Sequence, residues 1–354
     1  MLKILPYLKL VVEKKASDIF FTTAAPAMIK VEGEMFAVGK TLMTSEFIRE
    51  LAYSIMAPEQ QEQFEKELEI DLATQAGGLG RFRVNIFKQR GAVSMVMRYV
   101  RSDIPALEDL GAPESLKDLI MLKRGMILMV GATGTGKSTT LAAMINHRNE
   151  STAGHILSIE DPIEFVHANK RSIINQRELG QDTLSFDRAL QSAMREAPDV
   201  ILIGEIRKRD TMDSCMQLAN TGHLGLATLH ANNAYQALQR IVNLYPEDMR
   251  SQLYMDLAMT LRAIVSQRLV RRKDGRRCAA FEVMVNTPYI SDLILNRRIE
   301  EVKDAMSQSS DKGMLTFDQS LFRLYKEGVI EREEALSSSD SRGNLEAKIN
   351  FGGF

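Results

Sequence analysis

The pattern of apolar and polar residues divides the chain into two parts with different expected folds. In the first part, the segment 17–40 consists of short β-like runs broken by a proline and a glycine, which predicts a small hairpin sheet. Residues 44–58 carry apolar side chains at helical spacing, behind a threonine and a serine that could cap the helix. The segment 78–100 alternates between apolar and polar residues and predicts at least two strands. We therefore expect an α/β domain over residues 1–100.

Two prolines and a glycine between well-patterned segments mark residues 101–115 as a linker. Beyond it, the apolar runs "GMILMVG", "HILSIED", "DVILIGE" and "LGLATLH" alternate with helical or turn-rich stretches. This alternation predicts a mostly parallel sheet covered by helices, which we place over residues 116–280. Residues 281–354 are expected to be mainly helical, with a capped helix that ends at Gly328 and a loosely held, serine-rich tail over residues 336–354.

Composition and charge limit the partners and the kinds of site that we expect, and they leave the predicted domains unchanged. The chain of 354 residues is 45% hydrophobic, and its 45 basic and 46 acidic side chains nearly cancel. This balance does not favour nucleic acid or an anionic membrane as the main partner. The two cysteines stand outside any CxxC pair, so we expect neither a zinc ribbon nor a disulfide framework, and a reducing cytoplasm fits. The apolar runs are shorter than the roughly 20 residues needed to span a bilayer.

A glycine-rich motif follows the first apolar run of the second part. The sequence "GATGTGKS" fits G-x-x-x-x-G-K-[ST] from Gly131 to Ser138, between a predicted strand and a predicted helix. Glycines let the backbone wrap phosphate groups closely, so that its N–H groups and the helix N-terminus face negative charge. We expect Lys137 to reach the β- and γ-phosphates of ATP and Ser138 to bind Mg²⁺, although the motif also allows binding without hydrolysis. The expected nucleotide-binding set is Gly131, Thr133, Gly134, Thr135, Gly136, Lys137, Ser138 and Thr139.

Carboxylates follow the next two apolar runs. Glu160, Asp161 and Glu164 follow the second run. Glu205 follows the third run, where Gly204 occupies the position at which such strands normally carry an aspartate. Because catalytic groups gather at the carboxyl ends of parallel strands, we expect these acids to serve the metal and the attacking water. The alternative is that they cap helices or face solvent.

Two histidines flank the fourth apolar run. His223 and His230 are seven residues apart, a separation that puts them on opposite faces of a strand and argues against a shared metal ion. At the end of that strand, His230 could instead sense the γ-phosphate of a bound nucleotide. The alternative is a histidine whose hydrogen bonds are satisfied in a core or an interface.

Together, these motifs resemble a known family. "GATGTGKST", "IEDPIEF", "APDVILIGEIR" and "TGHLGLATLHANNA" stand in the order and spacing of the secretion-type ATPases, and within that group they look like the PilT/PilU retraction ATPases of type IV pili. "GRFRVNIFKQRG" before the linker and "KGMLTFDQSLFRLYKEGVI" near the C-terminus extend the resemblance over nearly the whole chain. "LATLHANNAYQAL" and the lack of an "AIRNLIRE"-like segment make the chain more similar to the PilU branch.

The resemblance implies a RecA-like P-loop core with a smaller PAS-like N-terminal domain and a helical C-terminal region, assembled into a homo-hexameric ring. It implies that Glu205 orders Mg²⁺ or its water, and that Glu164 is the first choice and Glu160 the second for the general base. Arginines of the N-terminal domain are implied to approach the nucleotide, although arginines on strands otherwise usually face solvent. The implied catalytic set is Glu164, Glu205, Glu160, Arg81, Arg83, Arg98 and His230.

The function that the resemblance implies is MgATP hydrolysis that drives type IV pilus retraction and twitching motility. Implied partners are a paralogous retraction ATPase and an inner-membrane pilus platform protein, which would hold the protein at the cytoplasmic face of that membrane. The main alternative is a nucleotide-binding accessory subunit with little activity of its own. A nucleic-acid translocase and a small-molecule phosphotransferase are further alternatives, which fit the near-neutral charge and the Gly-Glu strand end less well.

Overall fold

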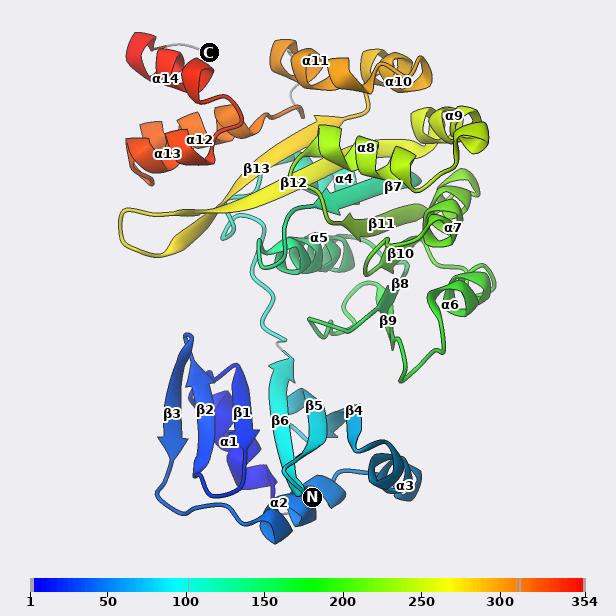
Figure 1. Cartoon of the computed structure of the whole chain (residues 1–354). Helices are drawn as coiled ribbons and strands as arrows, with labels where there is room; N and C mark the ends of the chain where they lie inside the picture. Colours follow the sequence, from blue (N-terminus) through cyan, green and yellow to red (C-terminus); the bar gives the residue numbers. More distant parts are fainter. Residues whose placement is uncertain (1–2, 101, 310, 312, 353–354) are drawn as a thin grey trace. The chain divides into compact units, whose positions relative to one another are not determined.

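The structure is a computed structural model and describes residues 3–100, 102–309, 311 and 313–352 (Figure 1). Some residues of the predicted segments lie outside these ranges. They are residues 1 and 2 of the expected N-terminal domain, residue 101 of the expected linker, residues 310 and 312 of the expected helical region, and the last two residues of the serine-rich tail. No helix within the described ranges is both long and apolar enough to cross a lipid bilayer.

The chain folds as two compact units, each with its own sheet. The first unit comprises residues 1–103 together with 164–166, and the second comprises residues 104–163 and 167–354. Separate clusters of buried hydrophobic side chains fill the two units. The predicted α/β fold class is confirmed in both, because each unit combines a sheet with helices.

A six-stranded antiparallel sheet forms the first unit, in the order β3-β2-β1-β6-β5-β4. Its strands are β1 (Asp18–Phe21), β2 (Ala27–Val31), β3 (Glu34–Val38), β4 (Glu69–Ala76), β5 (Gly80–Gln89) and β6 (Ala92–Val100). Its helices are α1 (Leu5–Glu13), α2 (Ser45–Tyr53) and α3 (Pro58–Glu67). Thr44 caps α2 by accepting a hydrogen bond from the Phe47 N–H. The predicted hairpin strands, helix and later strand pair of this region are therefore confirmed.

The second unit contains a seven-stranded sheet in the order β13-β12-β7-β11-β10-β8-β9. Its strands are β7 (Gly125–Val130), β8 (His155–Glu160), β9 (Ile173–Glu178), β10 (Val200–Ile203), β11 (Leu224–Leu229), β12 (Leu261–Arg271) and β13 (Arg277–Val285). Neighbouring strands are parallel except for the β12–β13 hairpin. The predicted parallel sheet is therefore confirmed, and the boundary that we placed after residue 280 falls inside β13.

Helices cover both faces of the seven-stranded sheet. One buried cluster contains α4 (Ser115–Ile120) and α5 (Lys137–Ser151). The other contains α6 (Phe186–Ala193), α7 (Arg209–Asn220), α8 (Ala234–Asn243), α9 (Arg250–Thr260), α10 (Pro288–Leu295) and α11 (Val302–Gln308). Short 3-10 helices occupy Glu247–Met249 and Ile299–Glu301. All six residues of β7 are buried, with Ile127 and Met129 in the first cluster and Met126, Leu128 and Val130 in the second, which identifies β7 as a central strand.

The C-terminal helices form a small packed layer on the β12–β13 hairpin, at the red end of the chain in Figure 1. They are α12 (Phe317–Lys326), α13 (Arg332–Ser338) and α14 (Arg342–Phe351). Leu345 of α14 is fully buried in a cluster that includes Phe317 and Val270. The prediction of a loosely held tail is wrong for the described residues, because one apolar residue per helical turn is enough to dock a short helix that otherwise looks polar.

Gly204, directly after β10, packs against the backbone at the end of β8. A Cβ atom at this position would lie 3.1 Å from the Cα atom of Glu160 and 3.3 Å from the carbonyl oxygen of Ile159. The Gly204 N–H also donates a 2.8 Å hydrogen bond to that carbonyl. Two parallel backbones therefore meet so closely here that a side chain would require a neighbour to move by a few tenths of an ångström, which gives a physical reason for glycine where an aspartate is the usual residue.

Glu282 of β13 is buried at the N-terminus of α8. It accepts hydrogen bonds of 2.7 Å from the Ala234 N–H and 2.9 Å from the Ser266 hydroxyl. Burial raises the pKa of Glu282 to about 7, whereas these two hydrogen bonds and the charge of Arg268 act in the opposite direction and that of Asp340 adds to the rise. The carboxyl group therefore satisfies the first N–H of α8 at a cost in desolvation.

We predict that Gly204→Asp lowers the free energy of unfolding by about 1–3 kcal/mol, because the new side chain overpacks the β8–β10 contact. Chemical denaturation measures the change. Gly343→Asp is the control, since a Cβ atom there meets nothing within 4 Å. If the two variants are equally stable, the end of β8 accommodates a side chain at residue 204. That result would contradict the packing explanation for the glycine.

We predict that Glu282→Gln stabilises the fold by about 1–3 kcal/mol near pH 8 and has little effect near pH 5. The folded pKa of Glu282 lies above its value in an unfolded chain, so the folded protein binds this proton more tightly. The free energy of unfolding therefore rises as the pH falls through the folded pKa. Above that pKa, Glu282 is charged and its burial destabilises the fold fully. Thermal denaturation at both pH values tests this, and a glutamine variant that is less stable at both would contradict it.

Candidate functional site

The phosphate loop joins the end of β7 to the start of α5. Gly131, Gly134 and Gly136 have φ angles of 156°, 78° and 88°, which residues with a side chain rarely adopt. A Cβ atom at Gly131 would lie 2.6 Å from the Thr135 hydroxyl oxygen and 2.7 Å from the Gln267 carbonyl oxygen. The predicted strand, loop and helix are confirmed, and the close backbone path accounts for the glycines.

The N-terminus of α5 is open to an anion. Its N-cap is Gly136, no side chain caps the helix, and the first turn contains no acidic residue. Lys137 is 9% exposed, and its Nζ donates hydrogen bonds of 2.8 Å to the carbonyl oxygens of Gly131 and Ala132. Burial lowers the pKa of Lys137, whereas the charge of Glu205 acts in the opposite direction. This combination of a buried ammonium and free helical N–H groups suits a phosphate group.

The remaining residues of the predicted nucleotide set follow the loop into α5. Ser138 and Thr139 belong to its first turn, and Ser138 and Thr133 are exposed while Thr139 is half-buried. The Thr135 hydroxyl donates a 2.9 Å hydrogen bond to the Ala132 carbonyl oxygen, which closes the loop. The structure therefore brings the whole predicted set together around the start of α5.

Gln267 of β12 supports the phosphate loop and was missed by the sequence analysis. Its side chain is 3% exposed, and its Oε1 accepts a 2.7 Å hydrogen bond from the Thr140 hydroxyl of α5. Its Nε2 would lie 2.9 Å from a Cβ atom at Gly136. A glutamine that is 127 residues from Thr140 in sequence has no local signature, and only the β7–β12 pairing brings it under the loop.

Glu205 and His230 meet at the carboxyl ends of two neighbouring strands. His230 Nε2 lies 3.1 Å from Glu205 Oε1, and the Arg207 guanidinium lies 2.7 Å from Oε2 of the same carboxylate. The hydrogen bond to Glu205 raises the pKa of Arg207. The Thr228 hydroxyl donates to the Gly204 carbonyl oxygen, which ties the end of β10 to β11. The structure therefore places two predicted site residues in direct contact and adds Arg207, which the sequence analysis did not single out.

The predicted acidic turn follows β8. Glu160 Oε1 accepts hydrogen bonds of 2.8 Å from the Ser158 hydroxyl and 3.3 Å from the Gln176 amide. Asp161 precedes a cis peptide bond to Pro162 and is exposed, and its charge contributes to the raised pKa of Arg207. Glu164 is exposed and belongs to the short segment that groups with the first unit. Which of these acids acts as a base stays a prediction.

The three predicted arginines lie in the sheet of the first unit. Arg83 of β5 stands opposite Arg98 of β6, and Arg81 precedes Arg83 by two residues on the same strand. Their neighbours Phe82 and Val84 point into the core, so the three arginines belong to the other face of the sheet. The Arg98 guanidinium pairs at 2.8 Å with Asp18, which is 4% exposed. The approach of these arginines to a nucleotide stays a prediction.

His223 and His230 lie immediately before and immediately after β11. His223 Nδ1 is 3.1 Å from the Thr221 hydroxyl oxygen, at the end of the strand away from Glu205. Over the described part of the chain, no three or more histidine, cysteine or acidic side chains gather so as to hold a metal ion. The two histidines therefore belong to different ends of the sheet, and only His230 lies beside another predicted site residue.

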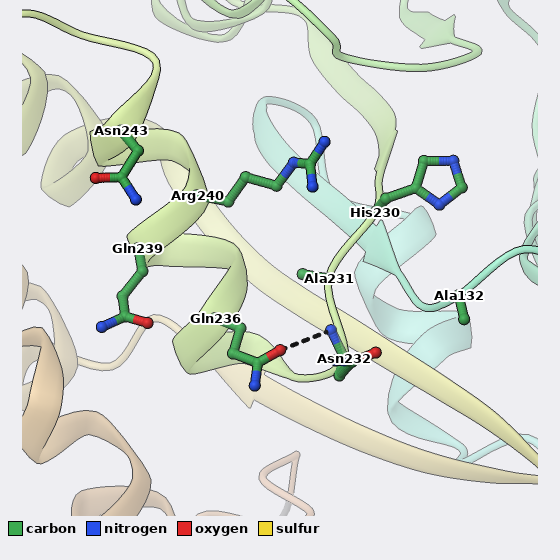
Figure 2. A pocket seen from close by; sticks show the side chains of 8 residues that line it. All are labelled: Ala132, His230, Ala231, Asn232, Gln236, Gln239, Arg240 and Asn243. Atoms are coloured by element: carbon green, nitrogen blue, oxygen red, sulfur yellow. Dashed lines mark hydrogen bonds between the residues drawn. The ribbon is translucent and has the colours of Figure 1, made fainter.

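A pocket of 430 Å³ lies between the phosphate loop and α8 (Figure 2). Arg240 extends from α8 toward the segment that carries His230, and Gln236 Oε1 accepts a 3.3 Å hydrogen bond from the Asn232 N–H. The lining residues are Ala132, His230, Ala231, Asn232, Gln236, Gln239, Arg240 and Asn243. The pocket is lined mostly by polar side chains and shares Ala132 and His230 with the site described above.

Comparison with known proteins agrees with this geometry. The chain matches the family described as "Type II/IV secretion system protein" over residues 3–321. It is 49% identical to the type IV pilus ATPase PilU of Pseudomonas aeruginosa over 346 residues, which cover 98% of this chain and 91% of that protein. It is 39% identical to the type IV pilus retractation ATPase PilT of the same organism over 320 residues, which cover 90% of this chain and 93% of that protein.

A solved structure gives the same result for the fold. The crystal structure of the pilus retraction motor PilT with bound ADP superposes with a TM-score of 0.90 and 38% sequence identity, and covers 97% of this chain and 99% of that chain. The RecA-like core, the PAS-like domain and the C-terminal helices that the motifs implied are thus the fold of this group. We conclude that the chain belongs to the type II/IV secretion system protein family and, within it, to the PilT/PilU group of type IV pilus ATPases.

Proposed function

We propose that the chain is one subunit of a homo-hexameric ring that hydrolyses MgATP and uses the energy to retract type IV pili, as in twitching motility. The observation that supports this most directly is the convergence of three strand ends. The phosphate loop follows β7, His230 follows the neighbouring β11, and Glu205 follows β10 next to it. Nucleotide chemistry needs these groups at one edge of a parallel sheet.

Within this site the loop and α5 bind the triphosphate. The helix N-terminus and the Lys137 ammonium face its negative charge. Lys137 donates to two loop carbonyls and has a third N–H for a phosphate oxygen. Ser138 and Glu205 would hold Mg²⁺, which uses few protein ligands and several waters. When bound, Mg²⁺ neutralises part of the charge that develops on the phosphate oxygens. His230 holds the Glu205 carboxylate from the side of β11 and lies where it can respond to the γ-phosphate.

The general base that takes a proton from the attacking water is proposed to be Glu164, with Glu160 as second choice. Glu164 is exposed and makes no hydrogen bond or ion pair with another residue that the structure describes, whereas Glu160 already accepts hydrogen bonds from Ser158 and Gln176. A carboxylate that is available to water serves better as a base than one with an oxygen that already accepts two hydrogen bonds.

The assembly is part of the proposal. In a ring, Arg81, Arg83 and Arg98 would supply positive charge to the transferring phosphoryl group, since guanidinium groups stabilise it effectively. The partners that we propose are further copies of this chain, a paralogous retraction ATPase and the inner-membrane platform protein of the pilus. The ring would then work at the cytoplasmic face of the inner membrane without nucleic acid.

A second candidate function is an accessory subunit that binds nucleotide and docks on the paralogous motor. The phosphate-loop motif keeps this alternative relevant, because it allows nucleotide binding without hydrolysis. Intact Lys137, Ser138 and Glu205 argue against it, because a subunit that only docks does not need hydrolytic groups.

We predict that Lys137→Ala and Glu205→Gln separate binding from turnover. Removing the ammonium should weaken ATP binding by roughly 10- to 100-fold, because a hydrogen-bonded charge contributes about 1.5–3 kcal/mol. The glutamine should leave binding within a few-fold and reduce steady-state MgATP hydrolysis by about 100-fold or more. Binding of a fluorescent nucleotide and release of phosphate from the purified ring measure the two effects.

The outcomes distinguish the two candidate functions. A ring whose turnover vanishes in Glu205→Gln is a motor in its own right. A wild-type ring that binds ATP but hydrolyses it no faster than Glu205→Gln would instead support the accessory role. Equal loss of binding in both variants would contradict the division of roles between the loop and the strand end.

We predict that Glu164→Gln lowers the rate of hydrolysis by about 100-fold, whereas Glu160→Gln lowers it by less than about tenfold, because only the former removes a free base. Both substitutions keep the size of the side chain, and each variant is the control for the other. Single-turnover hydrolysis with saturating MgATP measures the chemical step. If Glu160→Gln has the larger effect, Glu160 and not Glu164 is the general base.

A further inference from the structure

The segment that follows His230 is held in place by polar contacts that extend to the C-terminal helices. His230 is followed by residues 231–233 and then by α8, so the position of this short segment determines where the imidazole stands. The segment has no regular structure of its own. Its position therefore depends on the hydrogen bonds that other elements make to it.

Contacts from inside the unit fix the junction of the segment with α8. Asn233 caps the helix, because its side chain accepts a 2.9 Å hydrogen bond from the Gln236 N–H. The next N–H, that of Ala234, donates to the buried carboxyl of Glu282 at 2.7 Å. Gln236 in turn accepts from the Asn232 N–H. The backbone at the start of α8 is thus tied to β13.

Arg268 of β12 also contacts the segment that follows His230. Its Nη2 donates a 3.2 Å hydrogen bond to the Asn232 carbonyl oxygen, and its Nη1 donates a 2.9 Å hydrogen bond to the Ser338 carbonyl oxygen at the end of α13. Its guanidinium lies 3.9 Å from the centre of the Phe317 ring of α12. One planar side chain therefore contacts the segment after His230 and two of the C-terminal helices.

Asp340 completes this set of contacts from the tail. Its carboxylate lies 2.6 Å from the Arg268 guanidinium and is 11% exposed. It also accepts a 3.5 Å hydrogen bond from the Asn233 side chain. The Asp340 N–H donates to Asp318 of α12 at 2.9 Å, and Lys303 of α11 lies 3.7 Å from the carboxylate. A partly buried ion pair with these additional hydrogen bonds holds a defined geometry, which an exposed pair does not.

From these contacts we infer that Arg268 and Asp340 are positioning residues for hydrolysis. They hold Asn232 and Asn233, and through this segment they keep His230 against Glu205. The C-terminal helices thereby act on the site through one ion pair, without touching the nucleotide. This inference rests on the proposed function, since His230 and Glu205 matter for turnover only in an ATPase. It assigns the serine-rich tail a role in the rate of hydrolysis rather than in binding.

A role in packing alone makes different predictions. The apolar contacts of the C-terminal layer, such as Leu345 and Phe317, hold the helices on the hairpin without any contribution from the segment after His230. Loss of a packing residue lowers stability and affects binding and turnover alike. Loss of a positioning residue lowers kcat while the affinity for nucleotide stays the same, because only the alignment of His230 changes.

The test uses the full-length ring with Asp340→Asn and Arg268→Lys. Both variants keep the approximate size of the side chain, but the first loses the charge and the second replaces the planar guanidinium, with its two separate donor nitrogens, by a single nitrogen. We expect kcat for MgATP to fall by about tenfold while KM and the Kd for nucleotide change by less than about twofold. The control is Glu346→Gln, which removes the 2.8 Å pair with Arg332 within the tail and should leave kcat unchanged.

A double variant tests whether Asp340 affects kcat through His230. In a His230→Gln background, Asp340→Asn should add little further loss of kcat, because both changes act on the same contact. Independent, multiplicative losses would overturn the inference, and so would an unchanged kcat in Asp340→Asn. A change of KM and kcat in equal proportion, together with a lower melting temperature, would reduce Asp340 to a packing residue.

Hydrogen–deuterium exchange gives a readout that does not depend on turnover. Asp340→Asn should speed amide exchange in residues 230–236, whereas Glu346→Gln should not. If the wild-type ring does not hydrolyse ATP, the proposed function fails, and the exchange data alone decide whether Asp340 holds the segment. If the ring hydrolyses ATP but exchange in this segment is unchanged in Asp340→Asn, the inference fails and the proposed function stands.

Discussion

The parallel register of β7, β11 and β10 determines where the phosphate loop, His230 and Glu205 lie. Because these three strands run in the same direction, the loop before α5, His230 and Glu205 emerge at one edge of the sheet. The register also brings the end of β10 so close to β8 that a side chain at Gly204 would crowd the backbone of Glu160. The acid then stands one residue later, where its carboxylate can turn toward β11.

Much of this arrangement could be predicted from local sequence. The phosphate loop is visible because glycines at φ angles near 80° and a lysine at the start of a helix are a short-range requirement. The strands are visible because buried parallel strands consist of short apolar runs bounded by turns. The acids and His230 follow from these two patterns, since they stand at or soon after the ends of apolar strands, where catalytic groups gather in a parallel sheet.

The supporting residues could not be predicted in the same way. Gln267, Arg268 and Glu282 lie on the β12–β13 hairpin, far along the chain from their partners in α5, in the segment after His230 and in α8. Their roles depend on which strand pairs with β7, and single residues on a strand carry no signal of that pairing. The tail was misjudged for a related reason. Its serines are typical of a loop, while one buried leucine and one aspartate decide that it docks.

The hydrogen bonds of Lys137 have a consequence for how its ammonium meets a phosphate. The ammonium has three N–H donors, and carbonyl oxygens of its own loop accept from two of them, so one donor is left for an incoming anion. The two carbonyls also fix the direction of that remaining N–H. A charge that already points the right way loses little conformational freedom when a ligand arrives, so the loop recognises phosphate with a preorganised cation.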